Sequence, residues 1–172
     1  VVGGAAGQSM ESKLEMVLVR AVVAAVRRFV GVAAVFVGLI AHFEIGRVGG
    51  FLAAGGDPYE LGTFAALIAK KSGVELSILR VELFLGVFIG AVTFTGSVIA
   101  YGKLAGRVSS TAEKLPGGHM LNIAAAAVAV LTLIWYFNTG GFLPLFLMTL
   151  AALFIGYHLI MGIGGADMPV VV

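Results

Sequence analysis

Four apolar segments, each long enough to cross a lipid bilayer, constrain the fold of this chain more than any other feature. A membrane-spanning helix needs about 20 mostly apolar residues, and segments of that length cover residues 17–43, 82–102, 119–137 and 142–163. The long connection 44–81 contains "YELGTFAALIAKKSG", which predicts a short helix with a glycine as its stop. Because lipid offers the backbone no hydrogen bonds, such segments must pair their own polar groups. We therefore predict an all-α polytopic membrane protein, a transmembrane helix bundle of about four full spans with partial helices at both ends.

The two ends of the chain lead us to expect a piece of a longer protein. Residues 1–7 have the composition of the end of a helix, and "QSMESKLEM" (8–16) predicts a polar connector after it. At the other end, "MPVVV" (168–172) predicts the start of a further helix, because a proline in the first helical turn loses no hydrogen bond.

Composition supports lipid as the main solvent and excludes several classes of function. Hydrophobic residues make up 60% of the chain and charged residues 12%, whereas a soluble domain is about half apolar and a quarter charged. Most lysines and arginines lie in the connections, and no basic stripe with interleaved aromatics predicts nucleic-acid binding. The chain has no cysteine, which excludes disulfides and thiolate metal sites, and no other residues stand at metal-ligand spacing.

Positive charge in the short connections predicts an orientation. The connection 103–118 holds Lys103, Arg107 and Lys114, whereas the turn 138–141 holds no charge. Because basic short connections stay on the cytoplasmic side, we expect the first of these inside and the second outside, together with the long connection.

One face of the second span carries small and polar residues at helical spacing: Glu82, Gly86, Gly90, Thr93 and Ser97. Small residues let two helix backbones approach closely in lipid, so the stripe predicts a helix-packing seam. The alternative is a hydrated or proton-conducting groove with Glu82 at its mouth.

The first span holds Arg27 and Arg28 within an apolar run. If both lay outside the bilayer, the remaining residues 29–43 would reach only about 22 Å, less than a hydrocarbon core of about 30 Å. At least one arginine must therefore enter the membrane region, where it either extends to the interface or lines a polar path.

Two histidines and one carboxylate are the other candidates for chemistry. His42 and His158 could titrate near neutral pH; His42 is predicted at the end of a span, and His158 inside one as a hydrogen-bonded packing residue. Asn122 is predicted to bridge helices. Asp167, two residues before Pro169, is predicted either to cap a helix or to lie at the mouth of a proton path.

Three stretches carry a resemblance to a known family. "RVELFLGVFIGAVTFTGSVIAYGKLAGRVSS", "LPGGHMLNIAAA" and "GYHLIMGIGGADMPVVV" closely resemble the beta subunit of the proton-translocating NAD(P) transhydrogenase. The similarity runs through about residues 80–172. Upstream, "VVGGAAGQSMESKLEM" and "FVGVAAVFVG" resemble helices that precede these in the same family.

The resemblance implies a function and a set of partners. The family transfers hydride from NADH to NADP+ in peripheral nucleotide domains, and a membrane domain couples this to proton translocation. Residues 1–172 would be a fragment of that domain, not catalytic alone, with NAD(H) and NADP(H) bound outside it. The implied partners are the alpha subunit, the chain's own NADP-binding domain, a second copy of the whole enzyme and the lipid of a bacterial inner membrane.

The same resemblance makes Asp167 similar to a family carboxylate that faces the NADP(H) domain. Together with Glu82 and His158, which the polar pattern of the spans singles out, Asp167 is a candidate for the proton path or its coupling. One position departs from the pattern. The family reads roughly "EM-x-x-MPELVA-x-x-HSFVG", and Arg27 stands where that histidine would be. Arginine does not exchange protons near neutral pH. Either the relay chemistry moves to another subunit, or a slipped reading frame in the gene altered residues 17–28.

Two other functions remain open from the residues. An unrelated ion or proton transporter would carry the same glycine-striped helices with isolated acids. A structural membrane subunit would use every polar residue for packing. A dinucleotide-binding domain encoded later in the gene would favour a transhydrogenase over an unrelated transporter. Retained coupling in an assembled Asp167→Asn variant would favour the structural subunit.

Overall fold

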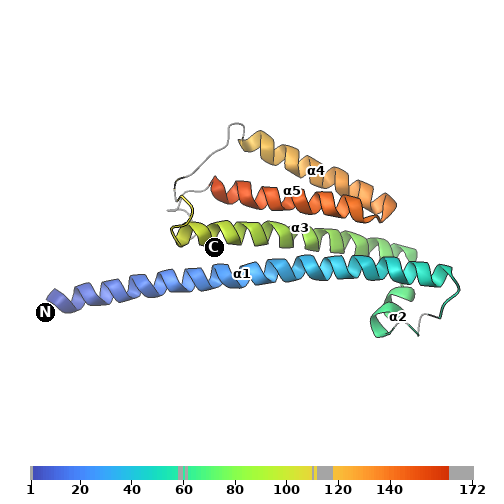
Figure 1. The fold of residues 1–172 in the computed structure, drawn as a ribbon, viewed down its shortest axis with the longest axis horizontal. Helices are drawn as coiled ribbons and strands as arrows, with labels where there is room; N and C mark the ends of the chain where they lie inside the picture. The colour runs from blue at the N-terminus through green and yellow to red at the C-terminus, as the bar shows by residue number, and fades with distance from the viewer. Residues whose placement is uncertain (1, 58–59, 61, 110, 112–117, 163–172) are drawn as a thin grey trace.

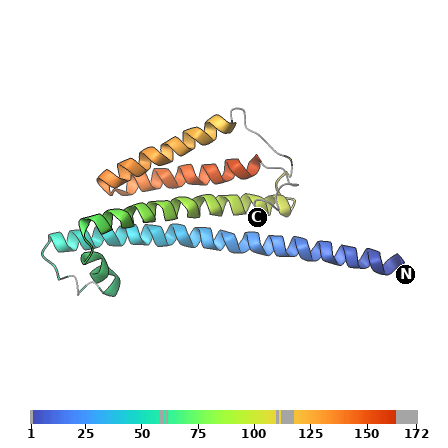
Figure 2. The same ribbon diagram turned by 180° about the vertical axis from the view of Figure 1, so that it is seen from behind.

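The structure, a computed structural model, describes residues 2–57, 60, 62–109, 111 and 118–162. This part of the chain contains helices and connections and no strand. The α-helices are α1 (Val2–Ala53), α2 (Thr63–Ala69), α3 (Gly73–Leu104), α4 (Gly118–Thr139) and α5 (Phe142–Met161). Figure 1 and Figure 2 show the four long helices side by side, in the order α1, α3, α5, α4, with α2 beside the C-terminal end of α1.

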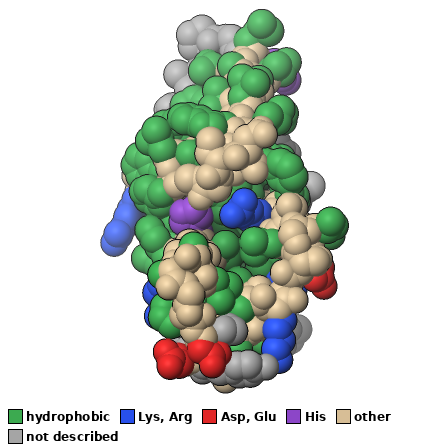
Figure 3. Space-filling model, turned by 90° about the vertical axis from the view of Figure 1, so that its right-hand side faces the viewer, with side chains coloured by type: hydrophobic (Ala, Val, Ile, Leu, Met, Phe, Trp, Pro, Cys, Tyr) green, Lys and Arg blue, Asp and Glu red, His purple; other side chains and the backbone are tan. Residues whose placement is uncertain are grey.

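Within the described ranges, four helices are long and apolar enough to cross a membrane: α1 from Leu14 onward, α3, α4 and α5. Large hydrophobic side chains such as Phe29, Phe36, Met120 and Ile123 are exposed on their outer faces. Hydrophobic side chains also cover much of the surface seen in Figure 3. Exposed apolar surface of this extent suits lipid rather than water. The predicted fold class, an all-α polytopic membrane protein, is confirmed.

Helix α1 is one continuous helix of 52 residues, where the sequence predicts a partial helix, a polar connector over 8–16 and a span over 17–43. The prediction of a connector was wrong because this polar stretch was interpreted as an interruption of the helix. Its Glu, Lys, Leu and Met residues are strong helix formers, and no proline interrupts them. At 1.5 Å per residue α1 is about 78 Å long, and its N-terminal part extends beyond the other helices (Figure 1). The partial helix predicted over 168–172 lies outside the described residues.

The long connection predicted over 44–81 is also mostly helical. Helix α1 continues to Ala53, and α3 begins at Gly73, a residue that the sequence reading took as a stop. Ser72 explains the early start: the Glu75 amide donates to Ser72 Oγ at 3.3 Å, and the Ser72 amide donates to Glu75 Oε2 at 2.7 Å. This reciprocal capping box satisfies two amides that would otherwise lack partners.

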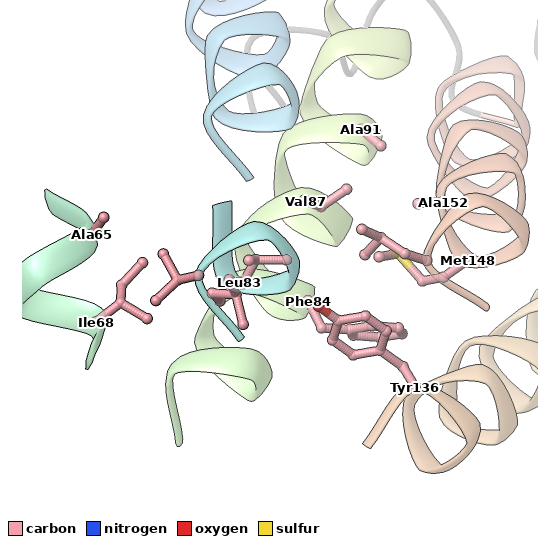
Figure 4. Packing of buried hydrophobic residues seen from close by; sticks show 12 residues of the cluster. Ala65, Ile68, Leu83, Phe84, Val87, Ala91, Tyr136, Met148 and Ala152 are labelled. Atoms are coloured by element: carbon pink, nitrogen blue, oxygen red, sulfur yellow. The ribbon is translucent and has the colours of Figure 1, made fainter. Parts of the chain in front are cut away.

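The core lies where α3 packs between α1 and α5. Figure 4 shows Val87 and Ala91 of α3 facing Met148 and Ala152 of α5, with Tyr136 of α4 closing one end. The buried cluster consists of Ile45, Val48, Ala65, Ile68, Leu83, Phe84, Val87, Ala91, Tyr136, Leu145, Met148 and Ala152. These contacts fix α3 as the central helix of the bundle.

Glycines allow two of the helix pairs to touch through their backbones. A Cβ added to Gly31 of α1 would lie 2.8 Å from the Gly90 carbonyl oxygen of α3, and one added to Gly90 would lie 2.9 Å from Gly31 O. Between α3 and α5, a Cβ on Gly156 would lie 2.5 Å from Val92 O. Close approach through small residues is a typical way for helices to associate in lipid.

Candidate functional site

Polar side chains of the described helices gather at the two ends of the α4–α5 hairpin. One group, the α5-end cluster, consists of Lys103, Asn122 and His158. The other, the turn-end cluster, consists of His42, Arg80 and Tyr136 and lies next to the turn between α4 and α5. Figure 3 views the molecule from the right-hand side of Figure 1, and a histidine and a basic side chain lie close together near its centre.

His158 is buried, with 6% of its surface exposed. Its Nδ1 lies 2.8 Å from Asn122 Oδ1, and because an amide oxygen only accepts, Nδ1–H is the donor of this bond. The Phe154 ring stacks on the imidazole at 5.8 Å, and a Cβ on Gly118 would lie 3.3 Å from His158 Cε1. The structure thus joins two residues that the sequence reading treated separately, a packing histidine and a bridging asparagine.

Lys103 is buried as well, with 5% of its surface exposed. Its Nζ donates to the main-chain oxygens of Ile160 at 3.0 Å and Met161 at 3.2 Å. These carbonyls end α5, where the helix dipole favours a positive charge. Lys103 therefore lies in the last turn of α3 and holds α5, whereas the sequence reading placed it in a solvated connection. Asp167 lies outside the described residues.

His42 lies inside α1, whereas the sequence predicts it at the end of a span. Its Nδ1 is 3.0 Å from Tyr136 Oη, and Tyr136 is almost fully buried. The guanidinium of Arg80 covers the turn, because a Cβ on Gly140 would lie 3.3 Å from Arg80 Cζ. Arg80 is a charged neighbour of both His42 and Tyr136.

Arg27 and Arg28, of which at least one is predicted to enter the membrane region, have different surroundings. Arg28 is half-buried, and its Cζ lies 4.4 Å above the centre of the Tyr101 ring, a cation–π contact. Within the described part of the chain, Arg28 Nε is buried without a hydrogen-bond partner. Arg27 is exposed on α1.

The polar stripe of α3 does not share one environment. Gly90 and Ser97 are buried, and Thr93 is half-buried. Glu82 and Gly86 are exposed, and a Cβ on Gly86 would meet no atom within 4 Å. Only the second half of the stripe is therefore covered by the described helices.

Lys103, Arg80 and the pairing of His42 with Tyr136 are the site features that sequence reasoning missed. Tyr136 is 14 residues after Asn122, which places both on one face of α4, and this spacing is the signal that was available. No group of three His, Cys, Asp or Glu residues in the described ranges could hold a metal ion.

The fold and these clusters define a polytopic α-helical membrane protein with titratable groups inside its helix bundle. The family model for the NAD(P) transhydrogenase beta subunit matches residues 1–172. Two curated relatives, both named NAD(P) transhydrogenase subunit beta and both from Rhodospirillum rubrum, are 34% identical over 171 residues, which is 99% of this chain and 33% of each relative. The chain belongs to the NAD(P) transhydrogenase beta subunit family. It spans about a third of the length of these relatives.

Proposed function

We propose that this chain forms part of the membrane domain of a proton-translocating NAD(P) transhydrogenase, where it couples hydride transfer from NADH to NADP+ to proton translocation. Membership of the beta subunit family supports the reaction class. The observation that carries the coupling role is the buried His158, whose ring Nδ1 lies 2.8 Å from Oδ1 of the half-buried Asn122. A titratable residue inside a membrane bundle is costly, and such residues mark proton or ion pathways.

The proposal assigns the nucleotides to other parts of the enzyme. A dinucleotide site of the usual kind needs a strand followed by a glycine-rich turn and a helix. The described ranges contain helices without strands, so these residues do not fit NAD(H) or NADP(H). The alpha subunit and an NADP-binding domain would supply the sites, and the complete enzyme would be a dimer in a bacterial inner membrane.

In this proposal the α5-end cluster is the coupling end of the domain. Lys103 fixes the last carbonyls of α5, and Asp167 follows α5 in the sequence. His158 would therefore exchange its proton near the end of α5, and the segment that carries Asp167 follows that end in the sequence. Glu82 and Arg27, both exposed, would act at the edges of the path.

The test uses the complete enzyme reconstituted into lipid vesicles. The rate of NADPH formation and the internal pH, reported by a trapped dye, are measured together for the wild type, Asp167→Asn and His158→Gln. We expect proton transfer to fall on the order of 10²-fold in both variants, with nucleotide binding retained. If the wild type transfers hydride without moving protons, the proposal fails. If assembled Asp167→Asn stays fully coupled, the structural alternative is the better one.

A further inference from the structure

We propose that His42, held by Tyr136, is a second proton-exchanging site of this chain, at the opposite end of the bundle from His158. The inference rests on the proposed function and adds a site to it.

Helix α4 connects the two histidines. His158 bonds to Asn122, and His42 bonds to Tyr136. The 14 residues between these partners span about 21 Å along the helix axis and make nearly four turns, so both partners point the same way. Between them, Ala129 and Thr132 are buried on the inward side of α4. The two histidines therefore lie at the two ends of one inward face, separated by a large part of a bilayer core of about 30 Å.

The bond between His42 and Tyr136 can hold the imidazole in either protonation state. A phenolic hydroxyl both donates and accepts hydrogen bonds. When Nδ1 is unprotonated, it accepts the Tyr136 O–H; when the ring is charged, Nδ1–H donates to the same oxygen. The 3.0 Å separation between Nδ1 and Oη suits both arrangements. His42 can thus gain or lose a proton without losing its partner, as a site of repeated proton exchange requires.

The groups around His42 come from four helices. Helix α3 contributes Arg80, whose charge acts on the ring, and α4 contributes Tyr136. Helix α5 contributes the non-titrating ring of Phe142, 6.2 Å away. In α1 itself, the neighbouring carboxylate of Glu44 is bound by Arg47 at 2.9 Å. The immediate partner that responds to the His42 proton is therefore the Tyr136 hydroxyl.

His42 supplies α1 with a chemistry that the arginines of the same helix lack. Arg27 and Arg28 keep their charge at any ordinary pH and so cannot pass protons. His42 lies 15 residues after Arg27 in α1, about 22 Å away at 1.5 Å per residue. It is half-buried, at the end of the bundle that holds the α4–α5 turn.

The experiment compares His42→Asn with the wild type in the complete enzyme, reconstituted into lipid vesicles. Asparagine places a hydrogen-bonding group near the position of Nδ1 but does not titrate. Proton transfer and NADPH formation are measured over roughly pH 5 to 8, the range in which histidine changes charge. We expect His42→Asn to assemble normally, to lose proton transfer on the order of 10²-fold and to lose an inflection in the pH profile. His119→Asn, at an exposed histidine of α4, should keep both.

The other outcomes overturn the inference. If His42→Asn keeps the wild-type rate and pH profile, His42 is a packing residue. If that variant fails to assemble, Tyr136→Phe decides, because it keeps the ring and removes only the hydroxyl; a pH profile that does not move rules out exchange at this pair. Wild-type vesicles that transfer hydride but move no protons would instead contradict the proposed function. If the wild type is coupled and His42→Asn has no effect, only the His42 site is contradicted.

Discussion

The ammonium of Lys103, in the last turn of α3, lies 3.0 Å from the main-chain oxygen of Ile160 in α5. A second contact, to Met161 O at 3.2 Å, places the same charge on two of the final carbonyls of α5. A buried ammonium is costly unless it is hydrogen-bonded. The last carbonyls of a helix lack the regular intrahelical partner, and Ile160 O is otherwise reached by the cap amide of Gly162. Lys103 therefore adds a charged donor to the end of α5 and binds α3 to α5.

Removing this charge should loosen the end of α5. Lys103→Met keeps the length and apolar stem of the side chain but leaves the Ile160 and Met161 carbonyls without the donor. We expect the free energy of unfolding to fall by about 1.5–3 kcal/mol, the range for hydrogen bonds to a charged group. Thermal unfolding in detergent, followed by circular dichroism, measures it. Lys71→Met, at an exposed lysine, is the control, and equal melting temperatures for the two variants would contradict the role of Lys103.

The glycine contact between α1 and α3 gives a second prediction. In Gly31→Ala the new methyl would lie 2.8 Å from both Gly90 O and Phe94 N, and these are backbone atoms that cannot turn aside. We expect a loss of about 1–3 kcal/mol in unfolding free energy, typical of overpacking. Gly86→Ala is the matched control in the same helix pair: its methyl meets no atom within 4 Å, and alanine favours a helix over glycine by up to about 1 kcal/mol. Destabilisation of both variants to the same extent would argue against the seam.

The helices could be predicted from the sequence because their signals are local. The apolar runs 119–137 and 142–163 lie close to the bounds of α4 and α5, Gly118–Thr139 and Phe142–Met161, since glycines interrupt the chain between them. The continuous α1 could not be predicted by the same rule. Its polar stretch 8–16 has a good helix propensity but the hydropathy of a connection.

The polar pairs of the site are a different case, because they depend on how helices meet. His158 is 36 residues from Asn122, and His42 is 94 residues from Tyr136. Hydropathy alone marks Lys103 as a connection residue, and only the packing of α3 against α5 brings its ammonium to the end of α5. Sequence patterns identified several of the participants, but their partners follow from the tertiary arrangement.

The hydrogen bond between His158 and Asn122 should appear as a coupling energy. In a double-mutant cycle, Asn122→Ala, His158→Ala and the double variant are unfolded under identical conditions. Because His158 is buried and Asn122 half-buried, we expect a coupling of about 1 kcal/mol, the usual net contribution of one hydrogen bond. Pairing Asn122→Ala with Thr149→Ala, whose hydroxyl bonds to Leu145 O within its own helix, should give additive effects. Additivity of the first pair as well would mean that the observed contact contributes nothing to stability.

The contact between Arg28 and Tyr101 allows the role of the aromatic ring to be tested separately from that of the hydroxyl. Because Arg28 Cζ lies 4.4 Å above the ring centre, the aromatic face rather than Oη should hold the guanidinium. Tyr101→Phe keeps that face, and we expect its stability to match the wild type. Tyr101→Leu removes it and should cost about 0.5–2 kcal/mol, the range for a cation–π contact between exposed and desolvated sites. Unfolding of both variants in an Arg28→Gln background supplies the check: there the difference between Phe and Leu should shrink, and a difference that persists unchanged would assign the effect to packing of the ring alone.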